Sequence, residues 1–378
     1  MEIRLISVRN GRAGMRLAKS IRNEEGLVLL AEGMELTDSL LKRLEKSGID
    51  YIYVHDPRTD DIEIPELLSE ETRREALRQV RFHFRTMMDR SARVRGVHNL
   101  DKDFRRVLNM MIDDLYHNKD AMMMLTEMSI SDHYLYQHSV NVCTYALVLG
   151  IAQDYSREEL MMLGLGALLH DIGKTQVPLE ILQKPGKLTD AEMDIVKAHT
   201  NVGFQMLKDE PNIPLISAHC ALQHHERLDG SGYPRGLKGG EIHEYAQWIG
   251  IIDVYDALTT NRAYRPAMLP HRALEILFTG ADSLYDIEKL KAFRDRIALY
   301  PLGITVTLNT GETGVVVDVN STYPQRPIVR IIRDAEGQEV HPPYEVDLSK
   351  KLSLMITGVD QLETGDSEWA EEWLEDIR

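Results

Sequence analysis

Hydrophobic and polar positions along the first 60 residues predict a small module of strands with one helix. The runs EIRLISV, LVLLAEG and YIYVHD are short and β-like, whereas TDSLLKRLEKSGI has the spacing of an amphipathic helix. Thr37 is a suitable N-cap for this helix, and Gly48 lies near its end. Residues 1–60 are therefore predicted to be an α+β module, with a polar, proline-containing linker at residues 56–66.

Residues 66–300 are predicted to be almost entirely helical. Residues 66–120, a helical connector, hold two amphipathic stretches with apolar stripes at Leu77, Val80, Phe84 and Met87 and at Phe104, Leu108, Met111 and Leu115. These stripes either form a homodimer contact or pack on the same chain with their arginines exposed to solvent. The second interpretation is the more usual one for a charged helix face.

Two later helices have clear start signals in the sequence. Ser156 with Glu159, and Thr189 with Glu192, each fit a capping box, so helices are predicted to begin at Ser156 and Thr189. Both lie within residues 121–300, which are predicted to form one helical bundle. The fold class is therefore mainly α, with the bundle as its largest unit.

The pattern changes after Pro301. The runs ITVTL, VVVDV and PIVRII alternate with the turn sequences NTGETG and DAEG, so residues 301–360 are predicted to form a small β-barrel or sheet. The last stretch, residues 361–378, is acidic. Its Trp369, Trp373 and Ile377 have helical spacing, which predicts a short amphipathic helix.

Composition narrows the choice of partners. The 378-residue chain carries 60 acidic and 44 basic residues, a net charge of −16, which argues against binding a DNA or RNA duplex but is compatible with a small basic pocket for a dinucleotide. The two cysteines, Cys143 and Cys220, lie in apolar helical segments and suit neither a disulfide framework nor a cysteine-rich zinc site. With no secretory signal and no run of about 18 apolar residues, the protein is expected to be cytoplasmic and not membrane-bound.

Histidine and aspartate residues interrupt several apolar helices of the bundle. In LLHDIGK, His170 and Asp171 end the helix that begins at Ser156. Adjacent side chains on a helix project about 100° apart, so only a helix end lets both reach one ion. There the Asp171 carboxylate is able to bridge two metals, while the imidazole binds one.

The other interruptions are spread over separate predicted helices. They are His138 in YLYQHSVNV, His199 in VKAHTNVG, His224 and His225 in LQHHE, and Asp253 in GIIDVYDAL. One such residue alone is most often a core histidine with a satisfied hydrogen bond. Several on successive helices favour a common metal site inside the bundle, with nitrogen and oxygen ligands that suit Fe, Mn, Zn, Co or Ni. Two such metals side by side predict phosphoester hydrolysis.

In this order and spacing, the motifs resemble a known family. His138, HDIGK at 170–174, His199, HHERLDGSGYP at 224–234, and Asp253 in IIDVYDALTTNRAYR are similar to the HD-GYP family of cyclic di-GMP phosphodiesterases. That family is a branch of the HD metal-dependent phosphohydrolases, and the resemblance covers about residues 125–300. It implies an HD-type helical bundle as the catalytic domain and hydrolysis of cyclic di-GMP to pGpG, GMP or both.

The resemblance also implies a role for each matching residue. A first metal would be held by His138, His170, Asp171 and Asp253, and a second by His199, His224, His225 and the bridging Asp171. Asp171 and Lys174 would be catalytic, with a metal-bridging hydroxide as the nucleophile and Lys174 contacting the scissile phosphate. The substrate-binding set would further comprise Tyr233 of the GYP loop, the phosphate-gripping Arg262 and Arg265, and Asp256, which orients a neighbour.

One departure from the family pattern concerns the number of metals. Family members with a third metal carry a glutamate four residues before the first histidine, where this chain has Tyr134. Two divalent transition metal ions are therefore expected, iron or manganese before zinc, cobalt or nickel. In the family, this difference bears on whether hydrolysis ends at pGpG or at GMP.

Two other functions fit the same residues. A receptor with little catalytic activity would keep the pocket and sense cyclic di-GMP, although such relatives usually lose HD or GYP residues that are all present here. Alternatively, the substrate is another cyclic dinucleotide, such as 3′,3′-cyclic GMP-AMP, or a nucleotide monophosphate. The pair Arg262 and Arg265 favours a ligand with two phosphates.

Overall fold

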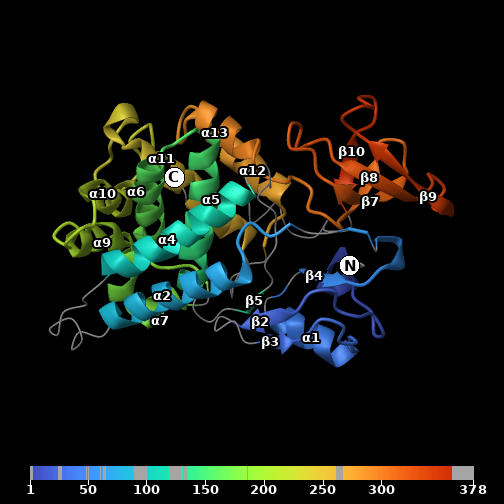
Figure 1. The fold of residues 1–378 in the computed structure, drawn as a ribbon, viewed down its shortest axis with the longest axis horizontal. Coiled ribbons are helices and arrows are strands. Elements are labelled where there is room, and N and C mark those ends of the chain that lie inside the picture. Colours follow the sequence, from blue (N-terminus) through green and yellow to red (C-terminus); the bar gives the residue numbers. More distant parts are fainter. Residues whose placement is uncertain are drawn as a thin grey trace.

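The structure is a computed structural model of the whole chain. It describes residues 3–23, 28–47, 49, 51–59, 61–62, 65–88, 100–118, 129–130, 134–184, 186–260 and 267–359. A bundle of helices makes up one side of the molecule, and two β-rich parts, from the N-terminal and C-terminal regions of the chain, lie together on the other side (Figure 1). The mainly α fold predicted from the sequence is confirmed.

The bundle is built around central helices that are apolar on nearly every face. Its helices are α2 Glu70–Met88, α4 Leu100–His117, α5 Tyr134–Ala152, α6 Arg157–Leu169, α7 Leu179–Leu182, α8 Asp190–Lys197, α9 His199–Leu207, α10 Leu215–Gln223, α11 Glu244–Thr259, α12 Pro270–Thr279 and α13 Ile287–Arg294. Helix α5 packs against α2, α4, α6 and α11. A helix without a polar face is stable only when neighbours cover it on all sides, which places α6 and α11 in the interior.

The predicted helix starts are confirmed. Ser156 and Glu159 form a reciprocal capping box on α6, and Thr189 and Glu192 form another on α8. In the N-terminal module, helix α1 (Asp38–Lys46) begins after Thr37, whose hydroxyl accepts a hydrogen bond from the Leu40 amide. Each cap satisfies a backbone N–H that has no partner within the helix, so these local signals are readable without tertiary information.

The apolar stripes of α2 and α4 are covered by the same chain. Val80, Phe84, Phe104, Leu108 and the other buried members of both stripes belong to one core that extends to α13. This confirms the same-chain interpretation of the stripes. A homodimer contact through residues 66–120 stays a prediction.

The N-terminal module contains two small sheets. Strand β1 (Arg4–Ser7) pairs antiparallel with β4 (Tyr51–Val54), and β2 (Ile21–Asn23) pairs antiparallel with β3 (Val28–Leu30). A further strand, β5 (Ser129–Ile130), pairs in parallel with β2. Residues 129–130 fall in the region predicted to be helical, and their strand depends on a partner more than 100 residues away in the chain.

The C-terminal region forms the predicted sheet. Its strands are β6 Thr305–Leu308, β7 Thr313–Asp318, β8 Ile328–Arg333, β9 Glu339–Asp347 and β10 Ile356–Val359, in the order β10-β6-β7-β8-β9, all antiparallel. Gly311 and Gly337 occupy the two predicted turns with φ of +87° and +81°, values that favour glycine. The predicted helix within residues 361–378 lies outside the described residues, as does Gly48.

The linker prediction for residues 56–66 is wrong over its first half. The Asp56 carboxylate is buried and accepts hydrogen bonds from Arg58 and Arg4. Ile62 is 2 % exposed and belongs to a core that joins the N-terminal module to the C-terminal sheet, with Tyr53 and Val306 among its members. This segment is ordered because a partner far away in the sequence covers its apolar side chains. The division of the chain into domains at residues 60, 120, 300 and 360 stays a prediction.

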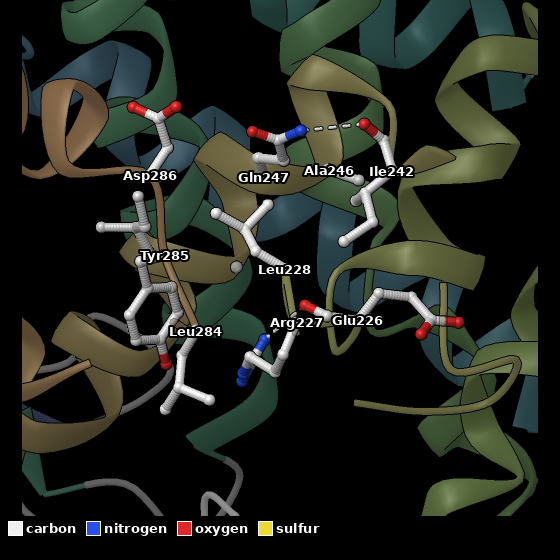
Figure 2. A pocket seen from close by; sticks show the side chains of 11 residues that line it. Glu226, Arg227, Leu228, Ile242, Ala246, Gln247, Leu284, Tyr285 and Asp286 are labelled. Atoms are coloured by element: carbon white, nitrogen blue, oxygen red, sulfur yellow. Dashed lines mark hydrogen bonds between the residues drawn. The ribbon is translucent and has the colours of Figure 1, made fainter. Parts of the chain in front are cut away.

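A small pocket lies between α11, the loop after α10 and the residues before α13. Leu228, Ile242 and Leu284 are among the apolar side chains that line it (Figure 2). The Gln247 side chain donates a hydrogen bond to the Ile242 carbonyl at its edge, 2.9 Å away.

Among the residues that the structure describes, none of the helices is both long and apolar enough to cross a lipid bilayer.

Candidate metal centre

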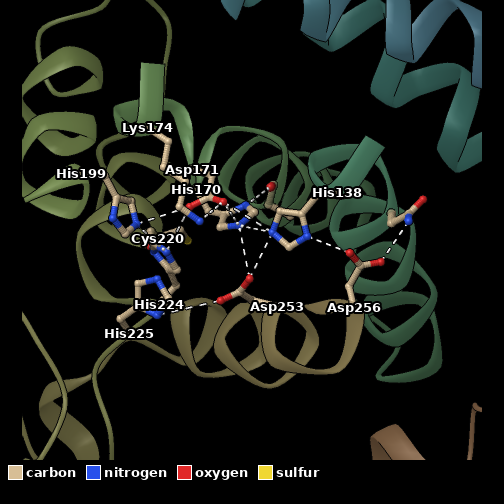
Figure 3. Close-up of polar contacts among 12 residues, drawn as sticks. His138, His170, Asp171, Lys174, His199, Cys220, His224, His225, Asp253 and Asp256 are labelled. Atoms are coloured by element: carbon tan, nitrogen blue, oxygen red, sulfur yellow. Dashed lines mark hydrogen bonds and ion pairs between the residues drawn. The ribbon is translucent and has the colours of Figure 1, made fainter. Parts of the chain in front are cut away.

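The histidines and aspartates singled out in the sequence converge inside the bundle (Figure 3). His138 lies on α5, His170 and Asp171 end α6, His199 begins α9, His224 ends α10, and Asp253 and Asp256 lie on α11. Each has 6 % or less of its surface exposed. Four of these positions are at helix ends, where the chain changes direction and adjacent side chains are free to face one point.

Asp171 lies between two groups of imidazoles. Its Oδ2 is 3.5 Å from Nε2 of both His138 and His170, whereas its Oδ1 is 3.3 Å from Nε2 of His199 and 3.7 Å from Nε2 of His224. Potential ligand atoms of His138, His170 and Asp171 form one cluster, and those of Asp171, His199, His224 and His225 form another. One carboxylate is thus placed to serve two ions.

Asp253 faces the same two clusters from α11. Its Oδ1 is 3.1 Å from Nε2 of His138 and 3.9 Å from Nε2 of His170, and its Oδ2 is 3.9 Å from Nδ1 of His225. The atoms around the first cluster are therefore two imidazole nitrogens and two carboxylate oxygens. That donor set suits a divalent transition metal ion.

Backbone and side-chain acceptors fix the orientation of four rings. The Nδ1 atoms of His138, His170, His199 and His224 lie 2.8, 2.7, 2.6 and 3.0 Å from Asp256 Oδ2, Ala167 O, Val196 O and Cys220 O, respectively. Each acceptor requires the proton to be on Nδ1, so Nε2 is the atom presented to the centre. This pattern of an outer hydrogen bond and an inner nitrogen is typical of metal-binding histidines.

The inward nitrogens lie so close together in pairs that each pair needs a proton or a metal ion beside it. Nε2 of His138 is 3.2 Å from Nε2 of His170, and Nε2 of His199 is 3.3 Å from Nε2 of His224. Two imidazole lone pairs at this distance repel each other unless a positive charge lies nearby. Asp171 Oδ1, beside the second pair, is buried without a hydrogen-bond partner, which costs free energy in a protein interior. The residues present fit bound metal ions.

The charges in the centre follow from burial and from its carboxylates. Burial lowers the pKa of His170 to about 4 and of His199 to about 3, so both rings are neutral. Burial also opposes ionisation of Asp171, but Lys174 and the surrounding imidazoles outweigh it and hold the pKa of Asp171 well below its ordinary value. Neutral imidazoles and ionised carboxylates are the forms that bind metals.

His138 is the exception. Burial lowers its pKa, but the Asp253 and Asp256 carboxylates outweigh burial and raise it to about 9. Without a metal, the His138 Nε2 proton therefore supplies the positive charge that the first cluster needs. A divalent cation in that cluster would displace this proton.

The GYP loop, residues 229–237, closes one side of the second cluster. The Tyr233 ring is stacked on the His225 ring, with centroids 4.6 Å apart and planes at 24°. Burial raises the pKa of Tyr233, so its phenol is neutral and able to donate a hydrogen bond. The residues HHERLDGSGYP thus bring a ligand pair and an aromatic wall to the same place.

Lys174 and Asp256 occupy different surroundings. The Lys174 ammonium is 2.6 Å from Asp171 Oδ2 and partly exposed, so it lies beside the clusters on their accessible side. Asp256 is 1 % exposed and lies behind His138, where it accepts hydrogen bonds from the His138 ring and from Asn141. This position suits orienting His138 and leaves Asp256 no evident path to a substrate. Arg262, Arg265 and the side chain of Tyr134 lie outside what the structure describes.

Sequence reasoning missed several residues of this region. Asn141 donates to Asp256 Oδ1 at 2.9 Å, and the Lys197 ammonium lies 5.3 Å from the centre of the Tyr233 ring. Their positions, three residues after His138 and two before His199, put them next to ligand candidates, which is the only signal that the sequence carries for them. Glu226 and Arg227 were also given no role, although both are buried next to His225.

Comparisons with known proteins agree with the motifs. Residues 122–288 match the HD domain family, and residues 305–367 match a KOW domain associated with the HD domain. The chain is 36 % identical over 233 residues to a cyclic di-GMP phosphodiesterase of Pseudomonas aeruginosa, a match that covers 61 % of this chain and 56 % of the relative. It is 42 % identical over 132 residues to the cyclic di-GMP phosphodiesterase response regulator RpfG of Xanthomonas campestris, covering 35 % of each chain.

A third relative is named for another substrate. The 3′3′-cGAMP-specific phosphodiesterase 3 of Vibrio cholerae is 40 % identical over 168 residues, which cover 44 % of this chain and 36 % of that protein. Among solved structures, an HDG"Y"P protein of Bdellovibrio bacteriovorus aligns with a TM-score of 0.46 and 16 % identity, covering 78 % of this chain and 98 % of that one. The chain spans about half or less of the length of these curated relatives. The HD-domain match, the complete HHERLDGSGYP motif and the curated cyclic di-GMP phosphodiesterase relatives together show that residues 122–288 are an HD domain of the HD-GYP type.

Proposed function

We propose that this protein is a metal-dependent phosphodiesterase that hydrolyses cyclic di-GMP. The observation that carries the proposal is the position of Asp171, whose two oxygens face two separate sets of inward-pointing imidazole nitrogens. Support also comes from relatives whose names give cyclic di-GMP phosphodiesterase activity. Two adjacent ions bridged by a carboxylate are a common arrangement for phosphodiester cleavage.

The two clusters would each hold one divalent ion. His138, His170, Asp171 and Asp253 would bind the first, and His199, His224, His225 and Asp171 the second. When bound, the ions supply Lewis acidity and lower the pKa of a water molecule for attack on phosphorus. Nitrogen and oxygen ligands suit iron, manganese, zinc, cobalt and nickel, and the absence of a thiolate gives no ground for preferring zinc. Of these metals, iron and manganese are proposed first. Family members with a third metal have a glutamate where this chain has Tyr134, and this difference is the reason for proposing two ions.

The remaining side chains would bind and orient the substrate. The Lys174 ammonium, now 2.6 Å from Asp171, would contact the scissile phosphate and stabilise the negative charge that develops on its oxygens. The neutral Tyr233 phenol, held beside His225, would contact a guanine or a phosphate. Arg262 and Arg265 would grip the phosphates, and hydrolysis would release pGpG, GMP or both.

The substrate is tested with a panel of cyclic dinucleotides. Protein loaded anaerobically with Fe(II) or Mn(II) is expected to convert cyclic di-GMP faster than 3′,3′-cyclic GMP-AMP or cyclic di-AMP, with products followed by chromatography. Faster conversion of 3′,3′-cyclic GMP-AMP would favour the second candidate substrate, which the Vibrio cholerae relative supports. Tight binding of cyclic di-GMP without product in both metal forms would contradict an enzymatic function.

Asp256→Asn is expected to weaken metal binding without abolishing it. The carboxylate accepts from both the His138 ring and Asn141, and an amide has one oxygen for these two donors. Loss of such an outer hydrogen bond typically lowers metal affinity about 10–100-fold. Metal retention during a chelator titration measures the effect. Asp209→Asn, at a side chain that is 83 % exposed, is the matched control, and equal retention by both variants would contradict the role of Asp256.

A further inference from the structure

The two residues after His225 are buried but have no role in the metal clusters. Glu226 and Arg227 are each 5 % exposed. Their side chains leave the backbone in opposite directions, so that the Arg227 guanidinium lies near Tyr285 while the Glu226 carboxylate lies on the far side of the turn (Figure 2). A buried carboxylate is expensive unless hydrogen-bond donors surround it.

The donors to Glu226 come from the end of the GYP loop. Its Oε1 accepts the Arg235 N–H at 2.8 Å, and its Oε2 accepts the Leu237 N–H at 2.9 Å. Both carboxylate oxygens thus bind backbone N–H groups within three residues of Pro234, the last residue of the GYP motif. Hydrogen bonds to an ionised carboxylate are among the stronger ones in proteins.

The loop is also bonded directly to the turn that carries His225. The Tyr233 N–H donates to the His225 carbonyl at 3.2 Å. A Cβ atom at Gly232 would overlap with the His225 carbonyl and the Arg227 nitrogen, so the loop backbone lies against this turn with no room for a side chain. Between its bond to His225 and its bonds to Glu226, the loop leaves the Tyr233 ring little freedom to move away from the His225 ring.

Arg227 fixes the other side of the same turn. Its guanidinium donates to the carbonyls of His224 and Glu226, at 3.2 and 3.0 Å, and lies 5.1 Å from the centre of the Tyr285 ring. The His224 carbonyl is at the C-terminal end of α10, where no helical N–H is available to it and where a cation is favoured, and the Glu226 carbonyl lies in the turn that follows. The turn is therefore a fixed support against which Glu226 is able to hold the loop.

We propose that Glu226 is a positioning residue, which holds residues 229–237 closed and keeps Tyr233 against His225 before substrate binds. The kinetic part of this inference rests on the proposed function, whereas the closed loop itself does not. An aromatic wall that is already in place lowers the ordering cost of binding a ligand. Glu226 is thus expected to act on substrate affinity and not on the metals.

Glu226→Gln tests the proposal, since an amide keeps one acceptor and turns an NH₂ group toward the second N–H. Hydrogen exchange, followed by mass spectrometry on metal-loaded protein without substrate, is expected to become on the order of tenfold faster at residues 229–237. Exchange within α10 is expected to be unchanged. The KM for cyclic di-GMP is expected to rise about tenfold, with kcat within about threefold of the wild type and metal content unchanged.

Glu241→Gln is the matched control. Glu241 is an exposed residue of the short helix η4 (Gly239–Glu241) and accepts the Lys238 N–H at 2.8 Å. Exchange at residues 229–237 that is no faster in Glu226→Gln than in Glu241→Gln would overturn the proposal. So would loss of metal together with substrate affinity, because Glu226 would then support the ligand turn and not the loop.

Two further outcomes are distinguishable. If the wild-type protein hydrolyses no cyclic dinucleotide, the proposed function fails while the exchange measurement still decides the role of Glu226. If Glu226→Gln does not fold, Glu226→Asp, which keeps two acceptor oxygens on a shorter side chain, takes its place. Exchange at residues 229–237 in this variant is expected to be faster than in the wild type, and wild-type exchange would overturn the proposal.

Discussion

Asp171→Asn is expected to lower phosphodiesterase turnover by about 10³-fold, the upper end for loss of one preorganised electrostatic contact, and to reduce bound metal below two ions per chain. The two Asp171 oxygens face different clusters, and one of them has no hydrogen-bond partner. An amide offers one oxygen to two ions and places an NH₂ group where the other ion would bind. Elemental analysis of metal content, together with product formation from cyclic di-GMP, measures both effects on the same sample.

The matched control for this variant is Asp209→Asn, which makes the same chemical change on an exposed side chain. It is expected to keep wild-type metal content and turnover. Circular dichroism of Asp171→Asn shows whether the variant is folded. A folded Asp171→Asn protein with full metal content and full turnover would contradict the bridging role and, with it, the two-ion site.

Lys174→Gln is expected to lower kcat by about 10²-fold to 10³-fold without any loss of metal. The Lys174 ammonium is 2.6 Å from Asp171 Oδ2, so removing it takes away a charge that competes with metal cations for this carboxylate. Metal affinity should therefore stay equal or increase. Activity falls because the scissile phosphate loses the positive charge beside its oxygens.

The combination of lower kcat and undiminished metal content distinguishes Lys174 from the ligands. Lys208→Gln is the control, since its ammonium makes only a long ion pair of 3.7 Å with Asp209 at the surface. Steady-state kinetics with cyclic di-GMP and metal analysis are the two measurements. If Lys174→Gln and Lys208→Gln have the same kcat, Lys174 has no part in stabilising the reacting phosphate.

Local chemistry explains which parts of the fold were predictable. The capping boxes at Ser156 and Thr189 act within one helical turn, and the turns at Gly311 and Gly337 need only a residue that tolerates positive φ. Strand β5 was not predictable, because its two residues form a strand only through pairing with β2. The same reason explains the failed linker prediction, since Asp56 and Ile62 are buried by segments that are distant in the sequence.

The ligand candidates of the site were readable in advance for a chemical reason. Histidine and aspartate on otherwise apolar helices need a partner in the interior, and HD at the end of α6 places imidazole and carboxylate near one point. The order of the motifs then led to the HD-GYP family. Asn141, Lys197 and Glu226 were not readable, because their contacts with Asp256, with Tyr233 and with the loop after Pro234 depend on how separate helices and loops pack.

By itself, the sequence determined which residues are available as ligands and on which helices they lie, because residue type and helical periodicity are local properties. Only the tertiary structure decided that the two oxygens of Asp171 face different imidazole pairs, and that Nε2 atoms from separate helices meet at 3.2 and 3.3 Å. A spacing of a few ångströms between side chains of separate helices depends on the packing of α5, α6, α9, α10 and α11 against one another. That packing is a property of the whole bundle, and no single segment of the sequence determines it.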